Sequence, residues 1–206
     1  MKLLLASRST TRRRMLEAAG VPFEAVAADI DEEGAKAGLI AAGFEAADLA
    51  EMLAELKAKS VTAEADALVI GADQVLELDD GTMLGKPASR GEALEQLSRI
   101  SGETHYLHSA AVAVENGQRV WGETESVAMD VRPLGEAFLQ AYLDAEYEAV
   151  KSSVGGYRIE GLGAQLFETV KGSHFAVLGL PLLPLLAYLR ERGLLKSCPW
   201  ASPMPK

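Results

Sequence analysis

Cysteine and long apolar runs are scarce in this chain. Among its 206 residues there is one cysteine, Cys198, which excludes an internal disulfide and fits a reducing compartment. The longest apolar run, FAVLGLPLLPLLAYL, is too short and too interrupted by proline and glycine to span a bilayer. The N-terminal KLLLAS runs directly into charged residues, unlike a signal peptide. We therefore expect a soluble, cytoplasmic protein that does not bind membranes.

Basic residues are also in the minority. The chain has 20 lysines and arginines against 30 aspartates and glutamates, for a net charge of -10. This balance argues against a nucleic-acid partner, which requires a basic surface. The exception is SRSTTRRR at 7–14, which places four arginines in eight residues. Positive charge gathered in one segment suits a small anionic ligand better than a long polyanion.

Apolar periodicity predicts a mixed α/β sheet with flanking helices in one domain over 1–195, followed by a frayed tail at 196–206. We expect strands at 2–6, 23–27, 67–78, 105–114, 119–127, 157–159, 165–170 and 175–178. We expect helices at 10–19, 46–63, 90–100, 134–145 and 181–193, and leave 30–44 unassigned. The continuous apolar start of ALVIGADQVLEL favours a central strand at 67–78, buried on both faces.

The arginine-rich segment lies where the first strand meets the first helix. Ser7 or Ser9 can cap this helix, whose free backbone N–H groups and dipole favour phosphate. Arg12 and Arg13 would add positive charge to the same site. The alternative is a capped helix with a solvated arginine face.

Carboxylates follow two of the expected strands. Asp73 lies at the polar end of a very apolar strand, where a carboxylate is costly unless it reaches a cleft or is paired. The DIDEE segment at 29–33 follows another expected strand, and one or two such carboxylates are enough to hold Mg²⁺. The alternatives are a strand-end turn or a structural ion pair at Asp73, and a solvated acidic loop at 29–33.

Other charged residues are weaker candidates. The GKP segment at 85–87 is not a Walker A loop, although Lys86 can still contact phosphate as a point charge. Lys57 is a helix lysine, a type that is usually solvated. Glu160 lies in the glycine-rich GGYRIEGLG and is positioned to face a ligand. From the residues alone we infer a phosphorylated substrate and a divalent metal, without naming the substrate.

The ordered motifs carry a resemblance to a known family. These motifs are LLASRSTTRRRML, DIDE, LAELKAKSV, IGADQVL, GKP, LSRISGETHYLHSAAVAV, GGYRIEGLGAQLF and KGSHFAVLGLPL. Over about residues 3–193 they resemble the Maf family of nucleotide pyrophosphatases. The resemblance implies two lobes around a deep cleft, an architecture similar to inosine-triphosphate pyrophosphatases, and often a homodimer. It also implies hydrolysis of a nucleoside triphosphate to monophosphate and pyrophosphate with a divalent cation, Mg²⁺ or Mn²⁺, as house-cleaning of the nucleotide pool.

The same resemblance implies a role for individual residues. Asp73 is the proton acceptor that activates water, and Glu32 is the acidic metal-site residue, so both would hold the cation. Lys57 and Lys86 neutralise phosphate charge. The N-terminal motif binds the triphosphate through Ser7, Ser9, Arg12 and Arg13. No role is implied for Arg14, because its helical direction differs from that of Arg12.

Two positions bear on the base. The branch of the family that acts on dTTP and UTP typically has threonine and glutamine where this chain has Gln74 and Glu160. DQV and EG instead resemble the branch that acts on 7-methyl-GTP, although Ala72 stands where that branch often has serine. A carboxylate accepts hydrogen bonds from the N1–H and amino edge of guanine and favours the positive charge of a 7-methylated base. A dTTP- or UTP-preferring enzyme, and a nucleotide-binding regulator of septum formation with little turnover, remain the alternatives.

Overall fold

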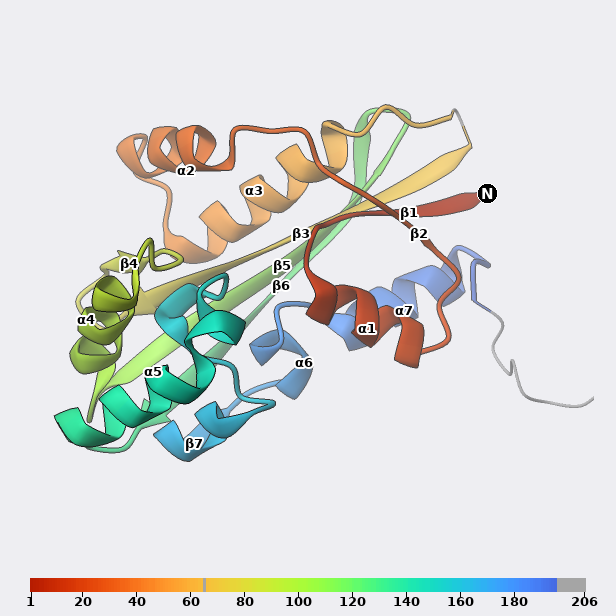
Figure 1. Cartoon of the computed structure of the whole chain (residues 1–206). Helices are drawn as coiled ribbons and strands as arrows, with labels where there is room; N and C mark the ends of the chain where they lie inside the picture. The colour runs from red at the N-terminus through yellow and green to blue at the C-terminus, as the bar shows by residue number, and fades with distance from the viewer. Residues whose placement is uncertain (65, 196–206) are drawn as a thin grey trace, which may run out of the picture.

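A mixed seven-stranded sheet forms the centre of the protein, in a computed structural model that describes residues 1–64 and 66–195 (Figure 1). The strands are β1 (Lys2–Ala6), β2 (Glu24–Val26), β3 (Ala67–Leu78), β4 (Met83–Leu84), β5 (Thr104–Glu115), β6 (Gln118–Val131) and β7 (Phe167–Lys171). Their order is β2-β1-β3-β5-β6-β7, with β4 paired to β3. β1 is parallel to β2 and β3, and the other pairs are antiparallel. The predicted mixed sheet is therefore confirmed.

Helices cover both faces of this sheet. They are α1 (Thr10–Ala18), α2 (Glu32–Ala41), α3 (Ala46–Lys59), α4 (Arg90–Ile100), α5 (Glu136–Val150), α6 (His174–Val177) and α7 (Leu182–Glu191), with short 3₁₀ turns η1 (Val154–Gly156) and η2 (Leu162–Leu166). Figure 1 shows α2 and α3 on one face, and α1 and α7 on the other. No helix in the described part of the chain is both long enough and apolar enough to cross a membrane.

The first half of β3 is buried on both faces because successive side chains point in opposite directions. Leu68 and Ile70 pack with α1 and α7, whereas Val69 packs with α3. Further along the strand, Leu76 joins a separate apolar cluster with α4 and α5. Asp73 therefore lies between two parts of the core, at the point where the apolar packing changes partners.

A glycine brings α3 unusually close to β3. A Cβ atom on Gly71 would lie 1.9 Å from the carbonyl oxygen of Ala54 and 2.8 Å from the backbone nitrogen of Ala58. Only glycine permits such an approach of helix backbone to strand backbone. The contact brings the last turn of α3, which carries Lys57, beside the strand that carries Asp73.

Most expected elements are present with shifted ends, and two expectations are wrong. Residues 157–159 do not form a strand, because Gly155 and Gly156 have φ angles of +74° and +68°, which turn the chain. Residues 175–178 lie in and just after α6, since a short apolar run does not distinguish strand from helix. The unassigned segment 30–44 contains α2, whose N-cap is Asp31.

Several boundaries also differ. The helix expected at 46–63 ends at Lys59, and the strand expected at 165–170 begins at Phe167 after η2. The expected tail at 196–206, with Cys198, lies outside the described residues. The division into one domain with two lobes stays a prediction.

Candidate active site

A cleft of about 560 Å³ opens where β1, β3 and several loops meet. Its lining includes nine of the ten residues selected from the sequence, namely Ser7, Ser9, Arg12, Glu32, Lys57, Asp73, Gln74, Lys86 and Glu160. The tenth, Arg13, is not among the lining residues. The fold thus gathers residues that span more than 150 positions of sequence into one hollow.

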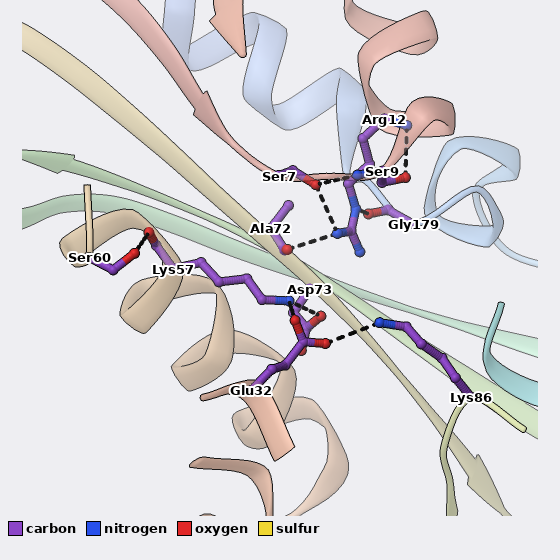
Figure 2. A network of polar contacts seen from close by, with 10 residues as sticks. All are labelled: Ser7, Ser9, Arg12, Glu32, Lys57, Ser60, Ala72, Asp73, Lys86 and Gly179. Atoms are coloured by element: carbon purple, nitrogen blue, oxygen red, sulfur yellow. Dashed lines mark hydrogen bonds and ion pairs between the residues drawn. The ribbon is translucent and has the colours of Figure 1, made fainter. Parts of the chain in front are cut away.

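A chain of alternating charges crosses the cleft (Figure 2). The Lys57 Nζ lies 2.8 Å from Asp73 Oδ1 and 2.9 Å from Glu32 Oε2. The other oxygen of Glu32, Oε1, lies 3.2 Å from the Lys86 Nζ. Lys57 and Asp73 are each 7% exposed, so their attraction is weakly screened. The predicted acids and lysines are therefore direct ion-pair partners.

Local structure explains how β3, α3 and α2 bring Asp73, Lys57 and Glu32 together. Asp73 lies two residues after Gly71 and so points to the same face of β3, toward α3. Lys57 lies in the last turn of α3, where a cation is favoured by the helix dipole. The Asp31 side chain accepts a 3.0 Å hydrogen bond from the Gly34 N–H and starts α2, which places Glu32 in the first turn.

The charge environment controls the ionisation of Glu32. Partial burial raises the pKa of this carboxyl, but the ammonium groups of Lys57 and Lys86 outweigh it and lower the pKa to about 2. Glu32 is therefore ionised at neutral pH. It can exchange its lysine partners for another cation without first losing a proton.

Arg12 has a different setting from the one that the sequence suggested. Its Nε donates to the Gly179 carbonyl at 2.6 Å, and one terminal nitrogen donates to the Ala72 carbonyl at 2.8 Å and to Ser7 Oγ at 3.5 Å (Figure 2). The residue is 9% exposed. Burial lowers the pKa of its guanidinium, although Asp73 and Glu32 act in the opposite direction. Much of this guanidinium therefore holds the backbone around the cleft together.

The first turn of α1 faces the cleft. Ser9 is its N-cap and accepts a 3.3 Å hydrogen bond from the Arg12 backbone N–H, while Ser7 Oγ accepts from the Ser9 N–H at 3.2 Å. The sequence left Ser7 and Ser9 as alternative caps, and the structure selects Ser9. Helix N-termini of this kind favour anions.

Gln74 and Glu160 line the cleft with Val177 and Leu178. The Gln74 Nε2 donates to the carbonyls of Ala176 and Val177 at 3.0 and 3.1 Å, and lies 3.0 Å from Ser109 Oγ. Because carbonyls only accept, this arrangement fixes the orientation of the amide, whose Oε1 is the acceptor end. Glu160 is exposed and lies in a turn. Two residues earlier, the Arg158 Nε donates a 2.6 Å hydrogen bond to Glu146 Oε2. The cleft lining therefore includes two acceptor groups, the Gln74 Oε1 and the Glu160 carboxylate.

The carboxylates fit a divalent cation of the magnesium type. Glu32 and Asp73 each place an oxygen within 3 Å of one point, the Lys57 Nζ. Within residues 1–64 and 66–195, no group of three or more histidine, cysteine, aspartate or glutamate side chains is arranged for a metal. A site of two carboxylates suits Mg²⁺, which retains waters and takes its other ligands from substrate phosphates.

Three arginines that line the cleft were not predicted from the sequence. Arg8, just before α1, and Arg14, within α1, are exposed and line the cleft, and Arg158 lines it as well. Arg8 and Arg14 belong to the segment that drew attention, but Arg14 was set aside by its helical direction. Arg158 has no sequence signal beyond its place two residues before Glu160.

Comparisons with known proteins show what this chain is similar to. The sequence model of a family described as Maf-like protein matches residues 2–192. A protein of Paramagnetospirillum magneticum named nucleoside triphosphate pyrophosphatase is 50% identical over 92% of this chain and 98% of its own length. One of the same name from Rhodopseudomonas palustris is 48% identical over 94% of this chain and 95% of its own. A solved HAM1 protein from Coxiella burnetii aligns with 64% of this chain and 73% of that chain at 15% identity, with a TM-score of 0.42.

Proposed function

This chain belongs to the Maf-like protein family, and on that premise we propose that its cleft hydrolyses a nucleoside triphosphate to the monophosphate and pyrophosphate. The observation that carries the proposal is the Asp73–Lys57–Glu32 chain of ion pairs in the same cleft as the N-terminus of α1. The relatives named nucleoside triphosphate pyrophosphatase match along nearly their whole length, which supports the same reaction.

Each part of the cleft has a task in this reaction. Asp73 accepts a proton from the water whose oxygen attacks the α-phosphorus, and the bond from that phosphorus to the bridging oxygen of pyrophosphate breaks. Lys57 and Lys86 balance the charge of the phosphates, and Ser7, Ser9 and the α1 terminus bind their oxygens. The family pattern is the basis for proposing Arg12 and Arg13 as further triphosphate-binding residues. The main role of Arg12 is to hold the backbone around the cleft. Glu32 and Asp73 would hold Mg²⁺ or Mn²⁺, which neutralises phosphate charge when bound.

We further propose 7-methyl-GTP as the preferred substrate. Gln74 Oε1 and the Glu160 carboxylate are both acceptors, and guanine offers a ring N–H and an amino group as donors. Uracil and thymine offer one N–H donor. The negative charge of Glu160 also favours a base that carries the positive charge of 7-methylation.

A substrate panel tests both levels of the proposal. The purified chain is incubated with Mg²⁺ or Mn²⁺ and with UTP, dTTP, CTP, GTP, 7-methyl-GTP or ITP, and pyrophosphate release is measured. Asp73→Asn is expected to lose about 100-fold or more in turnover, as removal of a general base does. Asp79→Asn, which changes an exposed aspartate outside this cleft, is expected to keep wild-type turnover.

Each outcome has one meaning. Turnover led by 7-methyl-GTP supports the reaction and the base preference. Turnover led by UTP or dTTP supports the reaction and overturns the base preference. If the folded protein binds nucleotides but releases no pyrophosphate, the proposed enzymatic function is overturned and a nucleotide-binding regulator is favoured.

A further inference from the structure

The Lys57 ammonium lies between the two carboxylates that the proposed function assigns to a divalent cation. Its Nζ is 2.8 Å from Asp73 Oδ1 and 2.9 Å from Glu32 Oε2, oxygens that come from β3 and α2 (Figure 2). Both carboxylates therefore already share one positive charge. A cation that uses the same oxygens has to separate Lys57 from them.

We propose that Lys57 blocks the cation position in the substrate-free protein, so that metal and triphosphate load together while Lys57 moves its ammonium to a phosphate oxygen. This inference rests on the proposed function, because it takes the triphosphate as the new partner of Lys57. It assigns Lys57 a role in the order of binding, in addition to charge neutralisation.

Burial makes the exchange obligatory for Lys57. The side chain is 8% exposed, and a buried ammonium without a partner is strongly unfavourable. Lys57 therefore leaves the carboxylates only when another anion reaches it, and a bound triphosphate supplies one within the same cleft.

Lys86 does not impose the same condition. Its side chain is 51% exposed, and among the described residues its ion-pair partner is Glu32, at 3.2 Å. Water can solvate its ammonium when it swings away, so it gives up its contact at little cost. The block is thus specific to one of the two lysines.

Coupling of this kind is reciprocal. If the triphosphate removes Lys57 from the carboxylates, it tightens cation binding, and the cation tightens triphosphate binding by the same factor. The free protein should then bind Mn²⁺ weakly. Removal of the Lys57 charge should allow tight Mn²⁺ binding without any nucleotide.

Mn²⁺ binding without nucleotide, followed by electron paramagnetic resonance of the free ion, tests the inference. Lys57→Met is expected to bind Mn²⁺ at least about tenfold more tightly than wild type, because one competing unit charge is gone. Lys59→Met is the matched control. It removes the same charge from the same helix, but Lys59 pairs with Glu55 at 2.5 Å and does not line the cleft. The control is expected to stay within about twofold of wild type.

A second variant protects the test against misfolding. Lys57→Gln keeps an N–H donor for both carboxylates and should also gain Mn²⁺ affinity, by a smaller factor than Lys57→Met. The inference is overturned if neither Lys57 variant binds Mn²⁺ more tightly than wild type, or if Lys59→Met gains as much.

Pyrophosphate release is measured on separate wild-type samples. Turnover by wild type without a gain in the Lys57 variants overturns this inference alone. A gain in those variants without turnover by wild type overturns the proposed function while supporting the competition between Lys57 and the cation.

Discussion

The Nε of Arg12 donates a 2.6 Å hydrogen bond to the carbonyl oxygen of Gly179, which lies 167 residues later in the chain. Gly179 has a φ of +95°, a conformation that side-chain-bearing residues rarely adopt. A further bond from the same guanidinium reaches the carbonyl of Ala72, the residue before Asp73. Arg12 therefore ties together the first helix, the strand of the proposed base and the loop after α6.

We expect Arg12→Lys to destabilise the protein although the charge is kept. Lysine lacks the planar fork that reaches Gly179 and Ala72 at once, and each lost hydrogen bond of a buried charged group costs about 1.5–3 kcal/mol. The free energy of unfolding, measured by urea denaturation, should fall by at least about 2 kcal/mol. Arg13→Lys, next along the helix and outside the cleft lining, should change it by less than about 0.5 kcal/mol. Equal stability of the two variants would show that Arg12 faces ligand and not backbone.

We expect Gly71→Ala to push α3 away from β3. The new methyl group would lie 1.9 Å from the Ala54 carbonyl oxygen, which requires movement of backbone. The loss of stability should exceed about 2 kcal/mol, as other overpacked core sites do, and turnover should fall because Lys57 is carried away from Asp73. Thermal unfolding and pyrophosphate release measure the two effects.

Gly38→Ala provides the matched control on a helix. Apart from the backbone of α2 itself, no atom of the described residues lies within 4 Å of a Cβ at this position. Alanine favours helix by about 0.5–1 kcal/mol over glycine. This variant should be as stable as wild type or more so. A Gly71→Ala variant that behaves like it would contradict the close contact of α3 with β3.

Sequence reasoning predicted the fold where one local signal dominated. The bounds of β3 were predicted at 67–78 because the segment starts with a continuous apolar run and is followed by the Asp79-Asp80-Gly81 turn. The strand expected at 157–159 was wrong because paired glycines upstream adopt positive φ, which composition does not reveal. The secondary structure of short segments depends on such backbone conformations and on tertiary contacts.

In the candidate site, too, local sequence features were predictable and contacts between distant segments were not. Asp73 stood out as a carboxylate at the end of an apolar strand, a purely local feature. Its pairing with Lys57 depends on the approach of α3 at Gly71, and the burial of Arg12 depends on a carbonyl in the C-terminal third of the chain. Contacts between distant segments of one sequence leave no local pattern, so side-chain roles that depend on them were not predictable.

We expect Glu160→Gln to shift base preference. The change removes the negative charge that we propose to pair with the donor edge and positive charge of 7-methylguanine, and a charged hydrogen bond contributes about 1.5–3 kcal/mol. The ratio of kcat/KM for 7-methyl-GTP to that for UTP should fall about tenfold or more. Glu168→Gln, an exposed change on β7 outside the cleft lining, should leave the ratio at its wild-type value. An unchanged ratio in Glu160→Gln would remove this residue from base recognition.

We expect His105 to make the protein less stable in mild acid. This side chain is fully buried, with its Nε2 2.7 Å from the Tyr157 hydroxyl, and burial lowers its pKa from 6.5 to about 4. Between those pH values the unfolded chain binds a proton that the folded chain does not, so stability falls as pH drops through this range. Between pH 7.5 and pH 5 the loss due to His105 should be about 2 kcal/mol.

Urea denaturation at a series of pH values isolates this contribution. His105→Gln keeps a side chain that can hydrogen-bond to Tyr157 but cannot take up a proton in this range. Whatever its stability at pH 7.5, its loss between pH 7.5 and pH 5 should be smaller than that of wild type by about 2 kcal/mol. His174→Gln, which changes an exposed histidine at the start of α6, should retain the wild-type slope. Equal slopes in His105→Gln and wild type would mean that His105 is protonated in the folded protein as readily as in the unfolded chain.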